Sequence, residues 1–208
     1  MLILLGSSNR AVIKRWQSLL SENTRFEKAS TLRELIDRCE DKKFDLALLH
    51  RFLVDAEAFS ELRKRSPMTK FFLLSDQPNE EEGLSFLKLG IVGYGNTYIS
   101  PARLAEAVRV VSNGGVWLGQ KVIQHLIQET YVRLKDPGSR DESEDKLSSL
   151  TRAERKIAEL VARGQSNLEI AADLKITERT VKAHLTSIYE KTKTSNRLNL
   201  ALLINRLG

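Results

Sequence analysis

The feature that most constrains this chain is the alternation of short apolar runs with amphipathic stretches over its first 115 residues. Apolar runs of about four residues are typical of buried strands, and apolar residues spaced by three or four are typical of helices. The strand-then-helix order repeats five times, which predicts an α/β domain with a parallel sheet covered by helices on both faces. We expect the strands at residues 2–5, 26–29, 46–49, 71–74 and 91–94.

A wider apolar stripe follows these five units. Residues 118–134 place Ile123, Leu126, Ile127 and Leu134 along one side of a predicted helix, which offers a surface for pairing two chains. Residues 135–146 then combine Pro, Gly and Ser with dense mixed charge, as interdomain linkers do. We therefore predict an α/β domain at 1–115, a linker helix and flexible linker at 116–146, and an all-α domain at 147–208.

The last third of the chain carries three helix starts in close succession. Thr151 and Glu154 form a capping box, a second short helix begins near Ser166, and Thr177 can cap a third. In that third helix an apolar stripe faces the core, which leaves short and basic residues on or near the opposite face; the four are Arg179, Lys182, Ala183 and Thr186. Two helices joined by a tight turn, with such an outer face, fit a helix into the major groove of DNA.

The distribution of charge also favours DNA binding by the last third of the chain. Between Leu147 and Gly208 there are 11 Lys and Arg against 6 Asp and Glu, so this segment holds +5 of the total net charge of +6. A localised positive excess favours a polyanionic partner.

The lone Cys39 lies at helical spacing beside Leu35 and Ile36, where a buried small apolar residue is expected. We expect a soluble cytoplasmic protein without a membrane span, metal or cofactor.

The run LTRAERKIAELVARGQSNLEIAADLKITERTVKAHLTSIYEKTKTSNRLNLA closely resembles the LuxR-type helix-turn-helix. The resemblance implies that Lys182, Ala183 and Thr186 face base edges, with Lys182 donating to a guanine and Ala183 touching a thymine methyl. Residues implied to position the domain on phosphates are Asn167, Thr180, Lys191 and Arg197. Double-stranded DNA is the implied partner, and a homodimer on paired half-sites the implied assembly.

The α/β domain resembles the receiver domain of two-component response regulators. Residues 44–50 are similar to the third strand of that family, residues 71–76 to the fourth, and residues 90–108 to the fifth strand and last helix. Aspartyl phosphorylation in a receiver needs an acceptor aspartate, carboxylates that hold Mg²⁺ and a lysine. Here Gly6 and Ser7 stand in place of the acidic pair, His50 in place of the acceptor and Thr97 in place of the lysine, while Ser75 matches. The resemblance therefore implies a pseudo-receiver that aspartyl phosphate does not switch.

His50 has two readings: it fills the vacated pocket, or it accepts a phosphoryl group itself. Because no Mg²⁺ site is evident beside it, transfer to the imidazole would have little electrostatic support, and we favour the first reading.

Another signal could replace phosphate. Trp117 and Leu118 are similar to the start of a cyclic di-GMP motif in atypical biofilm-matrix regulators, but Gly119 and Gln120 depart from its end, where an arginine would stack on guanine. Trp117 is otherwise a core or interface anchor. An unidentified ligand or protein partner at the receiver stays open.

The sequence thus predicts a sequence-specific transcription regulator. The alternative from another class is an interaction protein that acts through the degenerate receiver and seldom engages DNA. An enzyme is disfavoured, because the sequence offers no nucleophile paired with a base and no phosphate-cradling loop.

Overall fold

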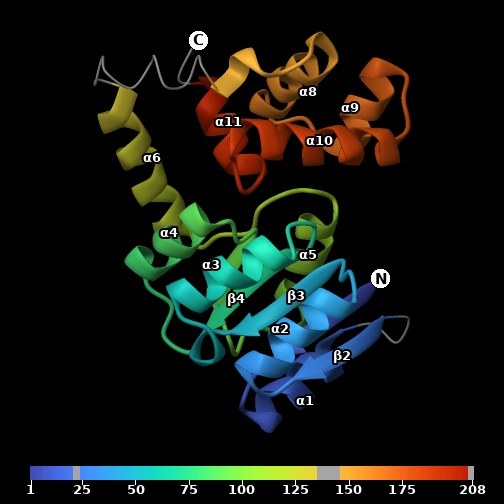
Figure 1. Ribbon diagram of the computed structural model, residues 1–208. Coiled ribbons are helices and arrows are strands. Elements are labelled where there is room, and N and C mark those ends of the chain that lie inside the picture. The colour runs from blue at the N-terminus through green and yellow to red at the C-terminus, as the bar shows by residue number, and fades with distance from the viewer. Residues whose placement is uncertain (21–23, 135–145, 206–208) are drawn as a thin grey trace. The chain divides into compact units, whose positions relative to one another are not determined.

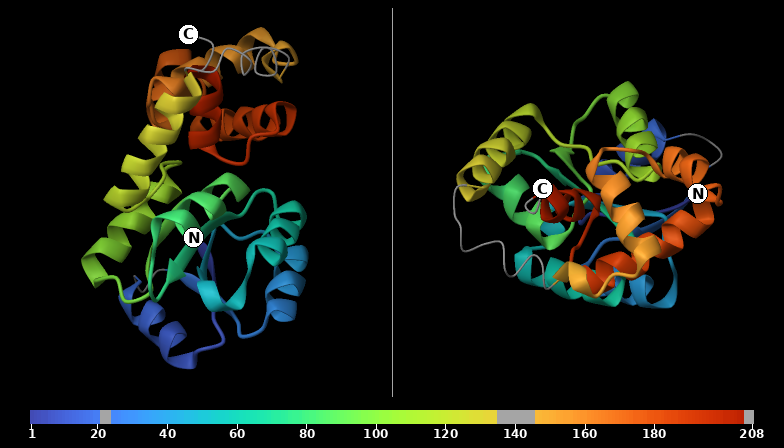
Figure 2. Two further views of the ribbon diagram at one scale, coloured as in Figure 1. Left: turned by 90° about the vertical axis from the view of Figure 1, so that its left-hand side faces the viewer. Right: turned by 90° about the horizontal axis from the view of Figure 1, so that it is seen from above.

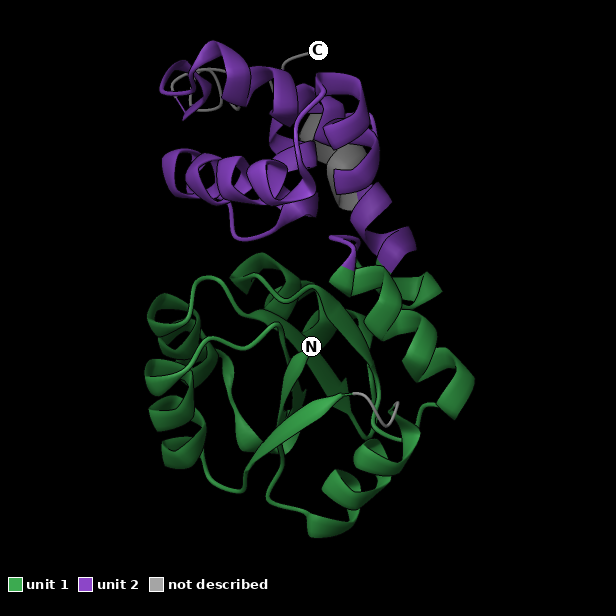
Figure 3. Ribbon diagram, turned by 90° about the vertical axis from the view of Figure 1, so that its right-hand side faces the viewer, with its two compact units in different colours: residues 1–112, 116–122 green, residues 113–115, 123–208 purple. Residues whose placement is uncertain are grey.

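The computed structural model describes the chain apart from residues 21–23, 135–145 and 206–208, and for residues 129–134 it describes the backbone alone. The chain divides into two compact units, which are described separately below (Figure 3). Unit 1 consists of residues 1–112 and 116–122, and unit 2 of residues 113–115 and 123–208. Except for Lys146, the predicted flexible linker lies outside the described residues, and so does the side chain of Leu134.

Unit 1 is a parallel five-stranded sheet in the order β2-β1-β3-β4-β5, with helices on both faces (Figures 1 and 2). Its strands are β1 (Leu2–Gly6), β2 (Arg25–Ala29), β3 (Leu46–His50), β4 (Lys70–Ser75) and β5 (Gly93–Asn96). Its helices are α1 (Arg10–Leu19), α2 (Leu32–Asp41), the 3-10 turn η1 (Arg51–Leu53), α3 (Ala56–Arg65), α4 (Glu80–Leu89) and α5 (Pro101–Ser112). This architecture confirms the predicted fold class.

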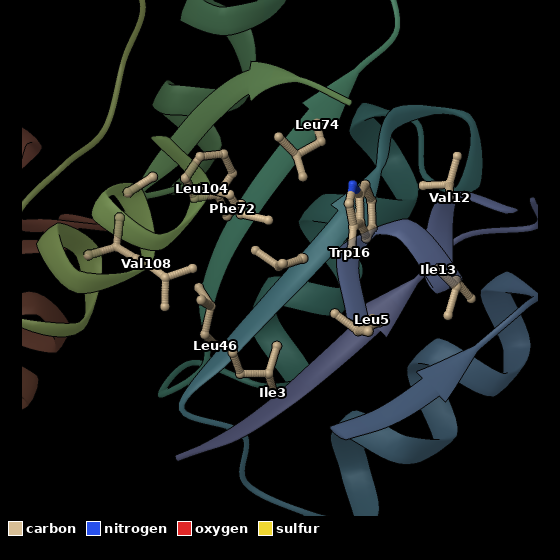
Figure 4. Close-up of a cluster of buried hydrophobic side chains, with 13 residues drawn as sticks. Ile3, Leu5, Val12, Ile13, Trp16, Leu46, Phe72, Leu74, Leu104 and Val108 are labelled. Atoms are coloured by element: carbon tan, nitrogen blue, oxygen red, sulfur yellow. The ribbon is translucent and has the colours of Figure 1, made fainter. Parts of the chain in front are cut away.

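The two-residue period of the strands divides the apolar side chains between two layers. Ile3 and Leu5 of β1 join the cluster beneath α1 and α5, which includes Trp16 (Figure 4). On the opposite face Phe59 of α3 contacts Phe71 of β4 edge to face. Cys39 is buried, as predicted, and burial raises the pKa of its thiol to about 11.

Side-chain caps begin four of these helices; the capping residues are Asn9, Thr31, Asp55 and Asn79. The end of α4 explains why β5 differs most from its predicted range, whereas the other four strands differ by at most one residue at either end. Gly90 adopts a left-handed conformation there, and the backbone N–H groups of Gly90 and Ile91 both donate to the carbonyl of Phe86. Ile91 therefore belongs to the helix cap, and β5 begins at Gly93 rather than at Ile91.

The predicted boundary of the α/β domain at residue 115 needs correction. The Trp117 backbone donates to the carbonyl of Val92 and accepts from the N–H of Tyr94, each at 2.9 Å, so it forms a parallel bridge beside β5. The Trp117 side chain is half-buried against the α1–α5 core cluster. Hydrophobic periodicity needs several consecutive strand residues to be recognised, and here only one residue pairs with β5. The return of the chain to the sheet edge therefore could not be predicted from the sequence pattern.

Helix α6 (Gln120–Leu134) follows, and its residues 123–134 belong to unit 2. The described residues of unit 2 also include the helices α8 (Arg152–Ala162), α9 (Asn167–Leu174), α10 (Glu178–Thr192) and α11 (Arg197–Asn205). Their apolar faces meet in one cluster that includes Ile157, Ile170, Val181 and Leu200. In the described part of the chain, no helix is both long and apolar enough to span a membrane.

Candidate nucleic-acid interface

Side-chain caps determine where α8, α9 and α10 begin, and these are the three helices predicted from the sequence for the C-terminal domain. Thr151 and Glu154 form the predicted capping box of α8, and Ser166 and Glu169 form a second box at α9. The Thr177 side chain accepts from the backbone N–H of Thr180 and so begins α10. Each cap provides an acceptor for backbone N–H groups that the start of a helix leaves without partners. The Thr177 cap therefore defines where α10 begins.

Helix α10 has one buried and one exposed face. Val181, Leu185 and Ile188 lie in the core of unit 2. On the other side Arg179, Lys182 and Ala183 are exposed, while Thr180 and Thr186 are half-buried; with Lys191 near the end of the helix, these are the positions predicted on α10 to meet DNA. They share one continuous surface because residues three and four apart lie on the same side of a helix.

Two short contacts organise this exposed face. The Lys182 ammonium lies 3.4 Å from the carboxylate of Glu178, one turn earlier. The Thr186 hydroxyl donates to the backbone carbonyl of Lys182 at 3.1 Å, so its side chain is directed back along the helix. An exposed ion pair of this kind is weak and can exchange for a base or a phosphate.

A buried carboxylate joins α8 to α10. Glu154 is only 4% exposed, and its carboxylate accepts hydrogen bonds from the backbone N–H of Thr151, the Ser187 hydroxyl and the Lys191 ammonium. The bond from Lys191 contributes most to lowering the pKa of Glu154, which falls to about 2. Lys191, predicted as a phosphate anchor, therefore has an intramolecular partner.

Arg197 and Asn167 also interact within the domain. The Arg197 guanidinium donates to Asn167 Oδ1 at 3.2 Å and to the carbonyl of Gln165. Asn167 itself is buried. These bonds tie the start of α11 to the α8–α9 turn, a structural role that the sequence did not indicate. Their role as phosphate anchors stays a prediction.

The predicted receiver pocket lies at the carboxyl ends of β1, β3, β4 and β5. The Ser7 hydroxyl and His50 Nδ1 are 3.1 Å apart, and His50 Nε2 lies 3.0 Å from Asp76 Oδ1. Ser7, Ser75 and Thr97 are buried, as is His50. The ring of Trp16 meets the His50 ring edge to face. His50 thus lies buried at this strand end with hydrogen bonds on both ring nitrogens.

The residues of this pocket do not fit Mg²⁺, which prefers several oxygen ligands including carboxylates. The Asp76 carboxylate is already hydrogen-bonded to His50. Burial alone would raise the pKa of Asp76, but its interactions with His50 and Thr97 lower it on balance. A Cβ atom at Gly6 would lie 2.9 Å from the end of the Leu49 side chain, so a larger residue there would require Leu49 to shift. Because Ser7 is fully buried, the Ser7–His50–Asp76 series does not present a nucleophile to a substrate either.

Comparisons with known proteins agree with the helical geometry. Residues 148–204 match the family described as bacterial regulatory proteins, luxR family. The C-terminal domain belongs to this family. It is a DNA-binding domain of the LuxR type. Residues 150–201, whose sequence resembles the LuxR-type helix-turn-helix, lie within the match.

Two relatives extend the similarity beyond the LuxR-type domain. The transcriptional regulatory protein DegU of Brevibacillus brevis is 35% identical over 150 residues, which cover 68% of this chain and 63% of DegU. The nitrate/nitrite response regulator NarL of Escherichia coli K12 is 28% identical over 200 residues, or 95% of this chain and 90% of NarL. The chain therefore resembles response regulators across both units.

Solved structures support the two-domain fold. The RcsB response regulator of Salmonella typhimurium aligns over 99% of both chains with a TM-score of 0.56 and 16% identity. An RcsB–DNA complex aligns over 100% of this chain and 99% of that chain, with a TM-score of 0.53. At such identity the likeness shows the fold alone: a receiver-like α/β domain joined to a LuxR-type domain.

The predicted pairing surface on α6 is exposed where its side chains are described. Ile127 is 63% and Ile123 43% exposed, and Leu126 is half-buried. Two large apolar side chains four residues apart lie on one side of the helix. Pairing through this face stays a prediction.

Proposed function

We propose that this protein is a sequence-specific transcription regulator in which α10 of the LuxR-type domain reads base edges in the major groove. The observation that carries the proposal is the exposed face of α10. Arg179, Lys182 and Ala183 lie open on it, while the opposite face of the same helix is held in the core. A basic side chain beside a methyl group suits a guanine beside a thymine in the groove.

We further propose that aspartyl phosphate does not control this activity. The support is the geometry around His50, which occupies the acceptor position and bonds both Ser7 and Asp76. Without a Mg²⁺ site or a lysine at Thr97, a phosphoryl group would gain little electrostatic stabilisation there. The protein is proposed to act in the cytoplasm as a homodimer, since paired recognition helices gain affinity and register on two half-sites.

Genome-wide footprinting of the protein tests the function and yields the operator. Protected sites should share one paired motif, and the purified protein should bind that motif with an affinity that falls steeply as salt rises. The alternative, an interaction protein that acts through the receiver, predicts no shared motif and salt-insensitive capture of a protein partner. Absence of both a motif and salt-dependent DNA binding would reject the proposal.

A further inference from the structure

Two lysines next to α10 adopt a left-handed backbone conformation that residues other than glycine rarely adopt. Lys175 and Lys193 both have φ of 53°, and they are the only non-glycine residues with positive φ in the part of the chain that the structure describes. The left-handed region brings the Cβ atom close to a backbone carbonyl, so glycine normally occupies it. At the end of α8 the chain does use glycine, with Gly164 at φ 85°.

These lysines cap the two helices of the helix-turn-helix. Lys175 ends α9, where its backbone N–H donates to the helix, and it stands two residues before Thr177, the cap of α10. Lys193 ends α10, where its N–H donates to the carbonyl of Tyr189. One lysine therefore precedes α10 and the other follows it.

The dimensions of α10 place these two positions near DNA strands. Its 15 residues span about 22 Å at a rise of about 1.5 Å per residue. The major groove is about 12 Å wide and has a sugar-phosphate strand on each side, so a helix lying in it is flanked by both strands. In helix-turn-helix domains the helix before the recognition helix crosses the backbone, and in homeodomains the end of the recognition helix contacts it.

Both side chains are available for such a contact. Lys175 and Lys193 are exposed, and neither makes an ion pair with another described residue. The predicted anchors Lys191 and Arg197, by contrast, have intramolecular partners.

We propose that Lys175 and Lys193 are backbone phosphate contacts that bracket the recognition helix. This inference rests on the proposed function. The ammonium groups neutralise phosphates at the two ends of α10 and carry no sequence information themselves. Binding to phosphate accounts for lysine, rather than glycine, at two strained positions. The competing structural explanation is that each lysine interacts favourably with the negative end of its helix.

Glycine variants separate the two explanations, because glycine relieves the backbone conformation and removes the charge together. Lys175→Gly and Lys193→Gly are titrated with a footprint-derived duplex and a scrambled duplex at several salt concentrations. We expect each variant to make the slope of log affinity against log salt shallower by about 0.9 per bound domain. The ratio of affinities for the two duplexes should stay unchanged, and the Tm of the protein should stay level or rise by up to about 2–4 °C.

Three further variants serve as controls. Lys175→Arg keeps the charge and should keep the slope, whereas Lys175→Asn tolerates the left-handed backbone, lacks the charge and should repeat the effect of glycine. Lys156→Ala removes one exposed charge from α8 and should leave the slope unchanged. An unaltered slope in the glycine variants, or an equal loss in Lys156→Ala, overturns the inference, and a lowered Tm with an unaltered slope assigns the lysines to helix capping. If the unsubstituted protein shows no salt-dependent DNA binding, the proposed function itself fails.

Discussion

The Lys191 ammonium on α10 donates to both carboxylate oxygens of Glu154 on α8, at 2.7 and 2.9 Å. Ser187, one turn before Lys191, donates to the same carboxylate at 2.7 Å. Helix α10 is thus fixed to α8 by a buried acid, in addition to apolar packing. Only the Glu154 side of this pair is buried, so removing Lys191 is costly because it leaves a buried carboxylate without its compensating charge.

The first prediction concerns acid stability. The folded pKa of Glu154 is about 2, below its ordinary value of 4.5, so its stabilising effect is full above pH 4.5 and is lost as pH falls towards 2. Glu154→Gln should lower the free energy of unfolding by on the order of 2 kcal/mol at pH 7 and flatten its dependence between pH 4.5 and 2. Urea unfolding at several pH values measures both. Glu190→Gln, at an exposed position of α10, is the control and should change neither.

The second prediction separates base reading from anchoring. Lys182→Ala should weaken binding to the cognate duplex by about 1–3 kcal/mol per half-site and relax preference at one base position. Titration of cognate and scrambled duplexes gives both values. Equal weakening on the two duplexes would make Lys182 a phosphate anchor and remove it from the proposed reading face.

Arg197 carries a prediction with two readouts. Since its guanidinium holds Asn167 and the carbonyl of Gln165, Arg197→Ala should lower the free energy of unfolding by about 1–3 kcal/mol. If Arg197 also reaches a phosphate, the salt dependence of DNA binding becomes shallower by about 0.9 per lost contact. Unfolding curves and salt titrations are run on the same variant. Lost stability with an unaltered salt slope would leave Arg197 a structural role alone.

The fourth prediction is that phosphoryl donors and phosphoryl analogues do not change the affinity of the protein for DNA. Mg²⁺ with beryllofluoride, or with a small phosphoryl donor, should leave DNA affinity unchanged, because His50 fills the acceptor position and bonds Asp76. Fluorescence anisotropy with a labelled operator is sufficient to measure this. A clear gain in affinity with either reagent would contradict the pseudo-receiver assignment.

Assembly gives the fifth prediction. Ile127→Glu places a charge in the exposed apolar face of α6, and it should convert a dimer into a monomer while both units stay folded. Sedimentation velocity reports the mass, and circular dichroism checks the fold. Gln128→Glu, at the neighbouring exposed position, adds the same charge and should leave the dimer intact if Ile127 lies at its centre. A dimer that persists in Ile127→Glu would move the interface to another surface.

Much of the fold could be predicted because its signals are local. Strand periodicity and the Thr151–Glu154 capping box lie within a few residues of sequence, and the structure confirms both. The contacts that shape the candidate site are not local. Glu154 and Lys191 are 37 residues apart in sequence, and Ser7 and His50 are 43 apart. No spacing rule links such pairs, so Lys191 could be read only as an exposed cation.

The return of Trp117 to β5 has a consequence for solubility. An edge strand exposes unpaired backbone groups that can recruit a strand from another molecule. At β5 the Trp117 backbone already occupies the carbonyl of Val92 and the N–H of Tyr94. At the opposite edge β2 carries charged side chains, and Glu27 there is paired with Arg38 and Lys42. The two margins of the sheet are thus shielded from intermolecular strand addition by different means, one by its own backbone and the other by charge.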